Sequence, residues 1–343
     1  MPCRVDRCVV PKEQKDKTMD ILVIGCGISG LTTGLCLLEA EHRVTIWARD
    51  LPPQTTSNVA AAVWLPFKAF PVERVTAWGK TTFQRFKALQ TEPGSGIFMA
   101  NVLDLRKESG ADPWWVSAVE DFRHAGQDEL PPGYVDGFAF EAPVIDTPVY
   151  LDYLLHIFRA RGGQIYQRAI ADLAEAFVQN SIVINCSGLG ARELVGDWDL
   201  HAARGQVMRV KHNGFRRVLV DEHNPAQLTY IVPRTHDIVL GGSYEEENES
   251  TEINTETTQA ILRRCTQLVP AFATLTPDDI MSLDCGLRPV RSTVRLEAER
   301  PAPQQLLIHN YGHGGAGITL SWGCAMEVVE LLSSFTYEKM RLG

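Results

Sequence analysis

The feature that most constrains the fold is a glycine pattern set between a strand and a helix. The apolar run at residues 20–24 has the length and composition of a buried strand. A G-x-G-x-x-G pattern follows directly at residues 25–30, and Leu31, Leu35 and Leu38 then recur at helical spacing. Residues 44–48 return as a second strand. The order strand, glycine turn, helix and strand predicts a βαβ unit with two parallel strands.

Each glycine of the pattern has its own physical purpose in a dinucleotide site. Gly25 permits the tight turn, Gly27 lets the backbone approach a pyrophosphate, and Gly30 allows the helix to pack closely on the strand. The start of the helix favours negative charge. The sequence therefore predicts a Rossmann-type nucleotide site, and a tight turn without ligand is the alternative.

An acidic residue stands where such sites bind ribose. Asp50 lies twenty residues beyond Gly30, at the end of the second strand, where its carboxylate would accept hydrogen bonds from ribose hydroxyls. Its neighbour Arg49 suits the 2′-phosphate of NADP instead. A solvated turn residue is a further interpretation of Asp50, so the residue that meets the ribose is left open.

Two other segments suit a flat, phosphate-bearing ligand. Residues 55–64 place hydroxyl side chains before a run of small residues, which would let a ring lie against the chain. Asn185, Cys186, Ser187 and Gly188 end a buried strand, and Gly188 leaves room for a ligand. Read alone, the first segment is also consistent with a loop entering a helix and the second with an ordinary strand-end turn.

The strongest pattern lies near the C-terminus. Residues 307–317 read LIHNYGHGGAG, with four glycines in six residues between a strand and a helix, and Gly323 follows. Such a run makes a nest of backbone N–H groups aimed by a helix dipole. Together with the first glycine pattern it resembles the FAD-dependent D-amino-acid oxidase family. The resemblance spans residues 19–332 and includes segments 55–64, 185–188, 204–206, 230–233 and 286–291.

The resemblance implies a non-covalently bound FAD, because it places no Cys or His with an attachment role beside the flavin. The last helix would point its N-terminus at the flavin pyrimidine edge. The residues that the resemblance implies for cofactor binding are Gly25, Gly27, Ile28, Ser29, Gly30, Arg49, Asp50, Thr55, Thr56, Ser57, Ala61, Ala62, Val63, Ile170, Ser187, Gly188, Arg288, Gly314, Gly315, Gly317, Ile318 and Thr319.

The resemblance also implies the substrate contacts. Arg288 would bind the α-carboxylate through its guanidinium fork, Tyr230 would add a neutral phenol, and the Gly315 carbonyl would meet the amine. Without the resemblance, a surface ion pair for Arg288 and an ordinary core tyrosine are the alternatives. The implied reaction is oxidation of a D-amino acid by hydride transfer from Cα to flavin N5. O₂ then reoxidises the flavin, so no side chain is expected to act as acid or base.

Two departures bear on specificity. Residues 224–229 lack the extra tyrosine that eukaryotic members carry before Tyr230, which implies a shortened or absent lid. Tyr244 stands where an enzyme for acidic substrates would offer a basic residue, so we expect neutral D-amino acids to be preferred. Arg234 is close enough in sequence to reverse that expectation.

The predicted fold is an α/β one, α+β overall, with a Rossmann-type FAD domain and a substrate domain built on an antiparallel sheet. A helix is expected near residues 74–89, but residues 63–135 otherwise show no clean alternation of strands and helices. The predicted FAD domain is discontinuous, and residues 1–18 form a tail. The FAD domain takes residues 19–62, 140–203 and 286–343, and the substrate domain takes residues 63–139 and 204–285.

Charge and composition limit the partners. With 33 basic and 42 acidic residues the net charge is −9. This charge does not suit binding to nucleic acid or to anionic membranes, which requires a basic surface. No predicted membrane span, signal peptide or peroxisomal tripeptide is found, so a cytoplasmic location is expected. No metal site is expected. The oligomeric state stays open, with a homodimer as one alternative.

Rival functions come from three classes. The first is a D-aspartate oxidase or a glycine or sarcosine oxidase-like amine oxidase, which differ from the favoured function only in substrate. The second is an NADP dehydrogenase, suggested by Arg49. The third is a flavin-binding protein without turnover.

Overall fold

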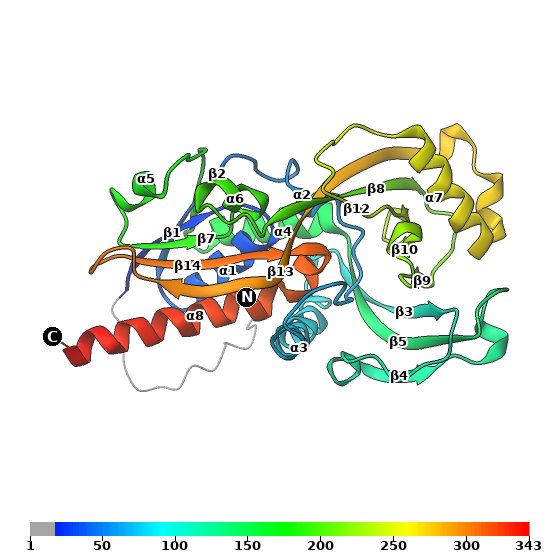
Figure 1. Cartoon of the computed structure of the whole chain (residues 1–343), viewed down its shortest axis with the longest axis horizontal. Helices are drawn as coiled ribbons and strands as arrows, with labels where there is room; N and C mark the ends of the chain where they lie inside the picture. The colour runs from blue at the N-terminus through cyan, green and yellow to red at the C-terminus, as the bar shows by residue number, and fades with distance from the viewer. Residues whose placement is uncertain (1–17, 343) are drawn as a thin grey trace.

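One large sheet organises the molecule (Figure 1). The computed structural model describes residues 18–342, and of residues 336–342 only the backbone. The predicted tail therefore lies almost wholly outside the described residues. The strand order is β4-β5-β3-β9-β10-β11-β8-β13-β14-β7-β1-β2-β6, with β12 beside β8.

The predicted βαβ unit forms the parallel end of the sheet. Strand β1 (Asp20–Ile24) pairs in parallel with β2 (Arg43–Ala48) and with β7 (Ile182–Asn185). Parallel pairing continues outward to β6 (Gln164–Gln167) and to β14 (Leu306–His313). All but the first residue of β1 are buried, as a strand covered on both faces requires.

Helices cover both faces of this parallel region (Figure 1). Helix α1 (Ile28–Glu39) buries Leu31 and Leu35, and packs against α4 (Thr147–Ala160) and α8 (Gly317–Leu342). The other face carries α5 (Leu173–Phe177) and α6 (Ala191–Leu194). Residues 314–335 have the length and apolar content of a membrane span, but 56% of the apolar 18-residue window within them is buried inside the molecule. This is the behaviour of a core helix.

The other half of the sheet is mostly antiparallel. Of the described strands in that half, β3 and β9 alone pair in parallel. Helix α7 (Thr255–Leu268) packs against β8, β10 and β11. The strands are β3 (Ile97–Arg106), β4 (Glu120–His124), β5 (Asp136–Ile145), β8 (His201–Lys211), β9 (Val218–Asp221), β10 (Thr229–Pro233), β11 (Asp237–Gly241), β12 (Glu245–Glu246) and β13 (Ile280–Glu299).

The predicted fold class is confirmed, and the chain passes between its two halves inside strands. Strands β5, β8 and β13 run through the predicted boundaries at residues 139/140, 203/204 and 285/286. Strand β13 pairs with β8 over its first half and with β14 over its second. The boundary positions themselves stay a prediction.

Residues 63–135 contain more regular structure than the sequence indicated. Helix α3 (Val72–Leu89) matches the predicted helix, but it packs against α8 although its residues were assigned to the substrate domain. Strands β3 and β4 were missed, as was the start of β5. Their burial does not alternate, since β3 buries four residues in succession, from Val102 to Leu105, and the period-two signal is lost.

Candidate functional site

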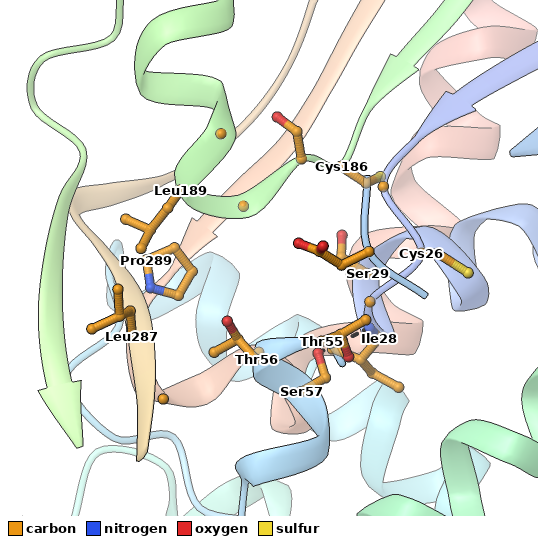
Figure 2. A pocket seen from close by; sticks show the side chains of 18 of the residues that line it. Cys26, Ile28, Ser29, Thr55, Thr56, Ser57, Cys186, Leu189, Leu287 and Pro289 are labelled. Atoms are coloured by element: carbon orange, nitrogen blue, oxygen red, sulfur yellow. Dashed lines mark hydrogen bonds between the residues drawn. The ribbon is translucent and has the colours of Figure 1, made fainter. Parts of the chain in front are cut away.

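A cavity of about 630 Å³ runs along the carboxyl ends of the parallel strands and on to β13. It is lined at one end by Trp47, Asp50 and Arg168 and at the other by Arg288 and Gly315. Figure 2 shows Thr55, Thr56 and Ser57 beside Ile28 on one wall, and Leu189, Leu287 and Pro289 on another. An elongated cavity at this edge of a parallel sheet is where dinucleotides bind.

The first glycine turn is shaped by close backbone packing. Gly25 has φ +107°, and a Cβ on it would lie 2.3 Å from the Cys186 carbonyl oxygen. A Cβ on Gly30 would lie 1.9 Å from the Gly25 carbonyl oxygen. Both positions therefore exclude a side chain, which keeps β1, α1 and β7 together at the mouth of the cavity.

Segment 55–57 closes over the start of α1. The Ile28 N–H donates to Ser57 Oγ at 3.1 Å, and the Ser29 hydroxyl donates to the Asn310 carbonyl at 2.9 Å. Thr55 donates to Asn58 Oδ1 at 2.7 Å. Gly27 also lines the cavity, so its backbone is exposed to a ligand between these groups.

The ribose end brings both candidate residues to the cavity. Arg49 Nε and Asp50 Oδ2 lie 2.8 Å apart, and both residues line the cavity. The Arg49 side chain is 78% exposed and that of Asp50 42% exposed. The greater burial of Asp50 favours the carboxylate as the group that faces a ligand. Ile170 lines the same end.

The end of β7 contributes Ser187 and Gly188. Asn185 Oδ1 accepts from the Ser187 hydroxyl at 2.6 Å and from its N–H at 3.2 Å, which fixes the turn. Gly188 has φ +59°, and a Cβ on it would meet nothing within 4 Å. Its glycine is therefore required by the backbone conformation.

The C-terminal glycine run ends in the nest that the sequence predicted. Residues Gly314–Ala316 form one turn of 3₁₀ helix that leads into α8. Gly314, Gly315, Gly317 and Ile318 line the cavity, and the N-terminus of the 26-residue helix follows directly. This end therefore presents N–H groups and a positive dipole end to a ligand. Two glycine turns that lie side by side along one elongated cavity fit FAD, since a Cβ on Gly317 would be 3.9 Å from Ile28 Cγ2.

Five residues expected at the cofactor do not line the cavity, and packing explains each. Gly30 packs on Gly25, and the Thr319 hydroxyl donates to the Leu65 carbonyl at 2.9 Å. Ala62 exchanges backbone hydrogen bonds with Ile145, and Val63 bridges to Val144. The Ala61 carbonyl accepts from Arg234 at 3.1 Å. Their contact with the cofactor stays a prediction, and the residues they support are on the cavity wall.

Arg288 projects from β13 into the cavity. Its Nη1 donates to the carbonyls of Ser243 and Arg204 at 3.0 and 3.2 Å. A Cβ on Gly205 would lie 2.2 Å from that Nη1, so the missing side chain leaves the guanidinium its space. Within residues 18–342, Arg288 makes no ion pair, and apart from these two carbonyls its polar neighbour is the phenol of Tyr230. The guanidinium is thus held in place and left able to bind an anion.

Tyr230 stands next to this guanidinium at the start of β10. Gly241 and Gly242 make room for its ring, since a Cβ on either would come within 3 Å of it. Burial raises the pKa of the Tyr230 phenol, against the opposing charge of Arg288. The phenol therefore stays neutral and can donate a hydrogen bond.

Three other cations have structural partners. Arg234 is buried in a bidentate pair with Asp237, at 2.7 Å for both contacts, so it does not serve the site. Arg291 binds Asp197, and Arg295 binds Glu297 and the Tyr311 hydroxyl. Both arginines therefore have structural partners, as Arg234 does.

The pKa values of both histidines of the C-terminal run are lowered. Burial lowers the pKa of His313 to about 4, and its Nε2 lies 3.0 Å from Asn310 Oδ1. Burial, together with the charge of Arg295, also lowers the pKa of His309. His309 lies within β14 and not in the turn, where it contacts Asn185.

Several wall residues carried no sequence signal. Arg168, Leu189, Leu287 and Thr251 line the cavity from four separate segments. Leu287 lies within segment 286–291, which the sequence had singled out for the neighbouring Arg288 on β13, but it was not named as a site residue. The others reach the cavity only through tertiary packing.

The chain matches the family described as FAD dependent oxidoreductase over residues 20–331. The D-amino-acid oxidase of Rubrobacter xylanophilus is 46% identical over 311 residues, which cover 90% of this chain and 94% of that protein. The D-aspartate oxidase of Homo sapiens is 33% identical over 330 residues, which cover 92% and 95%. The crystal structure of glycine oxidase from Bacillus cereus aligns with a TM-score of 0.74 at 18% identity and covers 92% of this chain and 95% of that one.

Proposed function

The chain belongs to the FAD-dependent D-amino-acid oxidase family, and on that premise we propose that it deaminates D-amino acids oxidatively in the cavity described above. It is an FAD-dependent oxidoreductase. The products are a 2-oxo acid, ammonia and H₂O₂, with O₂ as the electron acceptor. When bound, FAD accepts two electrons from the substrate and passes them to O₂.

The observation that carries the proposal is the unpaired guanidinium of Arg288 beside the neutral phenol of Tyr230. A partly buried cation without a counter-charge is costly unless a ligand supplies one. A planar carboxylate matches the fork of the guanidinium. The α-carboxylate of an amino acid is such a group.

These residues would orient the substrate and would not exchange protons with it. The carboxylate clamp at Arg288 and Tyr230 fixes one substituent of Cα, and the Gly315 carbonyl would accept from the amine. The amino acid loses the Cα hydrogen with its electron pair and one proton from nitrogen, which leaves a C=N bond. Water then hydrolyses the imino acid.

The test is a peroxide assay of the FAD-loaded protein with matched D- and L-amino acids, glycine and sarcosine. We expect turnover of neutral D-amino acids and little of their L-enantiomers. Higher kcat/KM for glycine or sarcosine would favour the amine oxidase alternative. Bound FAD without turnover of any D-amino acid would contradict the proposal.

Finer properties belong to the same proposal. A cytoplasmic location, a role in D-amino acid catabolism and a homodimeric state are proposed from the sequence alone. Fractionation of the expressing cells and light scattering of the purified protein test the first and the last.

A further inference from the structure

A second cation stands close to the substrate-binding arginine. Lys68 Nζ lies 4.3 Å from the centroid of the Tyr244 ring, and Arg288 Cζ lies 5.5 Å from the same centroid. Tyr244 is the position at which the sequence offered an aromatic residue in place of a basic one. The structure thus supplies a positive charge there from a segment far away in the sequence.

Lys68 forms a long, exposed ion pair with Glu246. Its Nζ is 3.7 Å from Glu246 Oε1, which is longer than a hydrogen bond, and the two side chains are 39% and 57% exposed. Lys68 Nζ donates no hydrogen bond to any residue in the range 18–342. The ammonium therefore keeps all three donors available for another anion.

The wall between the cavity and Lys68 is aromatic and continuous. The rings of Phe67 and Tyr244 meet edge to face at 5.6 Å. A Cβ on Gly315 would lie 2.8 Å from Phe67 Cδ1 and 3.7 Å from Arg288 Cδ, so Phe67 reaches the floor of the site. Lys68 itself has φ +45°, and its carbonyl lies against Gly314. The wall begins beside the substrate position and ends at the Lys68 ammonium.

We propose that Lys68 and Glu246 set the selectivity between neutral D-amino acids and those whose side chain ends in a carboxylate. The inference rests on the proposed function and names the substrate feature that the same site distinguishes. With the α-carboxylate at Arg288, a neutral side chain meets only Phe67 and Tyr244. A side-chain carboxylate that follows this wall is attracted by Lys68 and repelled by Glu246.

The test compares D-glutamate with D-alanine in two variants of the FAD-loaded enzyme. In Lys68→Met the ratio of kcat/KM for D-glutamate to that for D-alanine should fall about fivefold, the range of a partly exposed ion pair. In Glu246→Gln the ratio should rise by a similar factor. Lys68→Arg keeps the charge and should stay near the parent.

A matched ion pair elsewhere provides the control. Lys87 Nζ and Glu120 Oε2 lie 2.5 Å apart on the surface, and neither residue lines the cavity. Lys87→Met and Glu120→Gln should leave the ratio unchanged. Equal ratios in the parent, Lys68→Met and Glu246→Gln, or shifts of the same sign in both variants, would overturn the inference.

A binding measurement separates this inference from the proposed function. Titrating each amino acid against the flavin absorbance under anaerobic conditions gives the ratio of Kd values without turnover. A parent enzyme that binds D-alanine but never oxidises it would refute the proposed function. The effect of Lys68 and Glu246 on the Kd ratio would still decide the inference.

Discussion

At the scale of single residues, the molecule separates cations that hold the fold from cations left free to bind. Arg234, Arg291 and Arg295 each meet a carboxylate within 3 Å. Among the described residues, Arg288 meets two carbonyl oxygens and the Tyr230 phenol but no carboxylate, so the guanidinium is oriented without being neutralised. The difference in partners, and not the residue type, marks the binding residue.

Arg288→Ala should lower kcat/KM for D-amino acids by an amount that corresponds to about 3–5 kcal/mol of lost transition-state stabilisation. The variant lacks both the charge-assisted pair with the α-carboxylate and the restraint that this pair places on Cα. Arg288→Lys should also be poor, since an ammonium lacks the fork. Tyr230→Phe removes one neutral hydrogen bond and should cost about 0.5–1.5 kcal/mol. Steady-state kinetics and FAD content measure the effects.

The control for Arg288 is Arg263→Ala, which removes an exposed arginine of α7 away from the cavity. It should keep parental kinetics. FAD content should barely change in either variant. Near-parental kcat/KM in Arg288→Ala with FAD retained would show that Arg288 is structural.

Asp50→Ala should weaken FAD retention more than Arg49→Ala. Both variants break the same Arg49–Asp50 ion pair, so the difference between them isolates the contact of each residue with the ribose. Dialysis followed by the flavin absorbance of the retained protein gives the Kd for FAD. Equal retention in the two variants would exclude Asp50 as the preferred ribose ligand.

At the scale of elements, the pairing of β8 with β13 builds the substrate site. The register sets Gly205 opposite Gly286 and Ala203 opposite Arg288. Small residues along β8 therefore leave the volume that the Arg288 side chain occupies. A residue of one strand is positioned by the absence of side chains on its neighbour.

Gly205→Ala should reduce kcat/KM while FAD content and thermal stability stay close to parental. The added Cβ would lie 2.2 Å from Arg288 Nη1, and the flexible guanidinium can move away at a smaller cost than the backbone. Activity should fall less than in Arg288→Ala. Gly110→Ala is the control, because its Cβ meets nothing within 4 Å. A loss of folding in Gly205→Ala would contradict this account.

At the scale of the whole molecule, the antiparallel half carries a buried acidic cluster remote from the cavity. Asp104 and Asp221 lie on β3 and β9, with Glu222 directly after β9. Arg106 binds Asp104 and lies 3.9 Å from Glu222 Oε1, and the Tyr134 hydroxyl donates to Asp221. Burial raises the pKa of Glu222, and the nearby Asp104 raises it further, although the charge of Arg106 opposes both.

A raised carboxyl pKa sets the sign of a pH effect. Above the ordinary pKa of Glu and up to the raised value, the folded chain holds a proton that the unfolded chain releases, so the free energy of unfolding falls as pH rises. Glu222→Gln removes that proton exchange. Its melting temperature should therefore fall less than that of the parent between about pH 5 and pH 8. Parallel Tm profiles for the two proteins would contradict the assignment.

The sequence by itself determined those parts of this protein that depend on short, contiguous segments: the βαβ unit and the two glycine turns. A strand, a glycine turn, a helix and a second strand are contiguous, so residues 20–48 predicted the βαβ unit. The glycines of residues 312–317 predicted the second turn at the cofactor cavity. At Gly25 and Gly30, the backbone that leaves no room for a side chain lies a few residues away or on a neighbouring strand. That is why pattern alone was enough there.

The tertiary structure alone decided where long side chains and non-local strands go. Strand β3 pairs with β5 and β9, which are distant in sequence. From the sequence, Arg234 was a candidate for contact with the substrate, but in the structure it binds Asp237 and the Ala61 carbonyl. Lys68 reaches Tyr244 across 176 positions of the chain. A long side chain can take many directions, and the partner that selects one is brought near only by folding. The sequence therefore predicted the cofactor site and a carboxylate ligand, whereas the residues around the position proposed for the substrate side chain emerged only from the folded molecule.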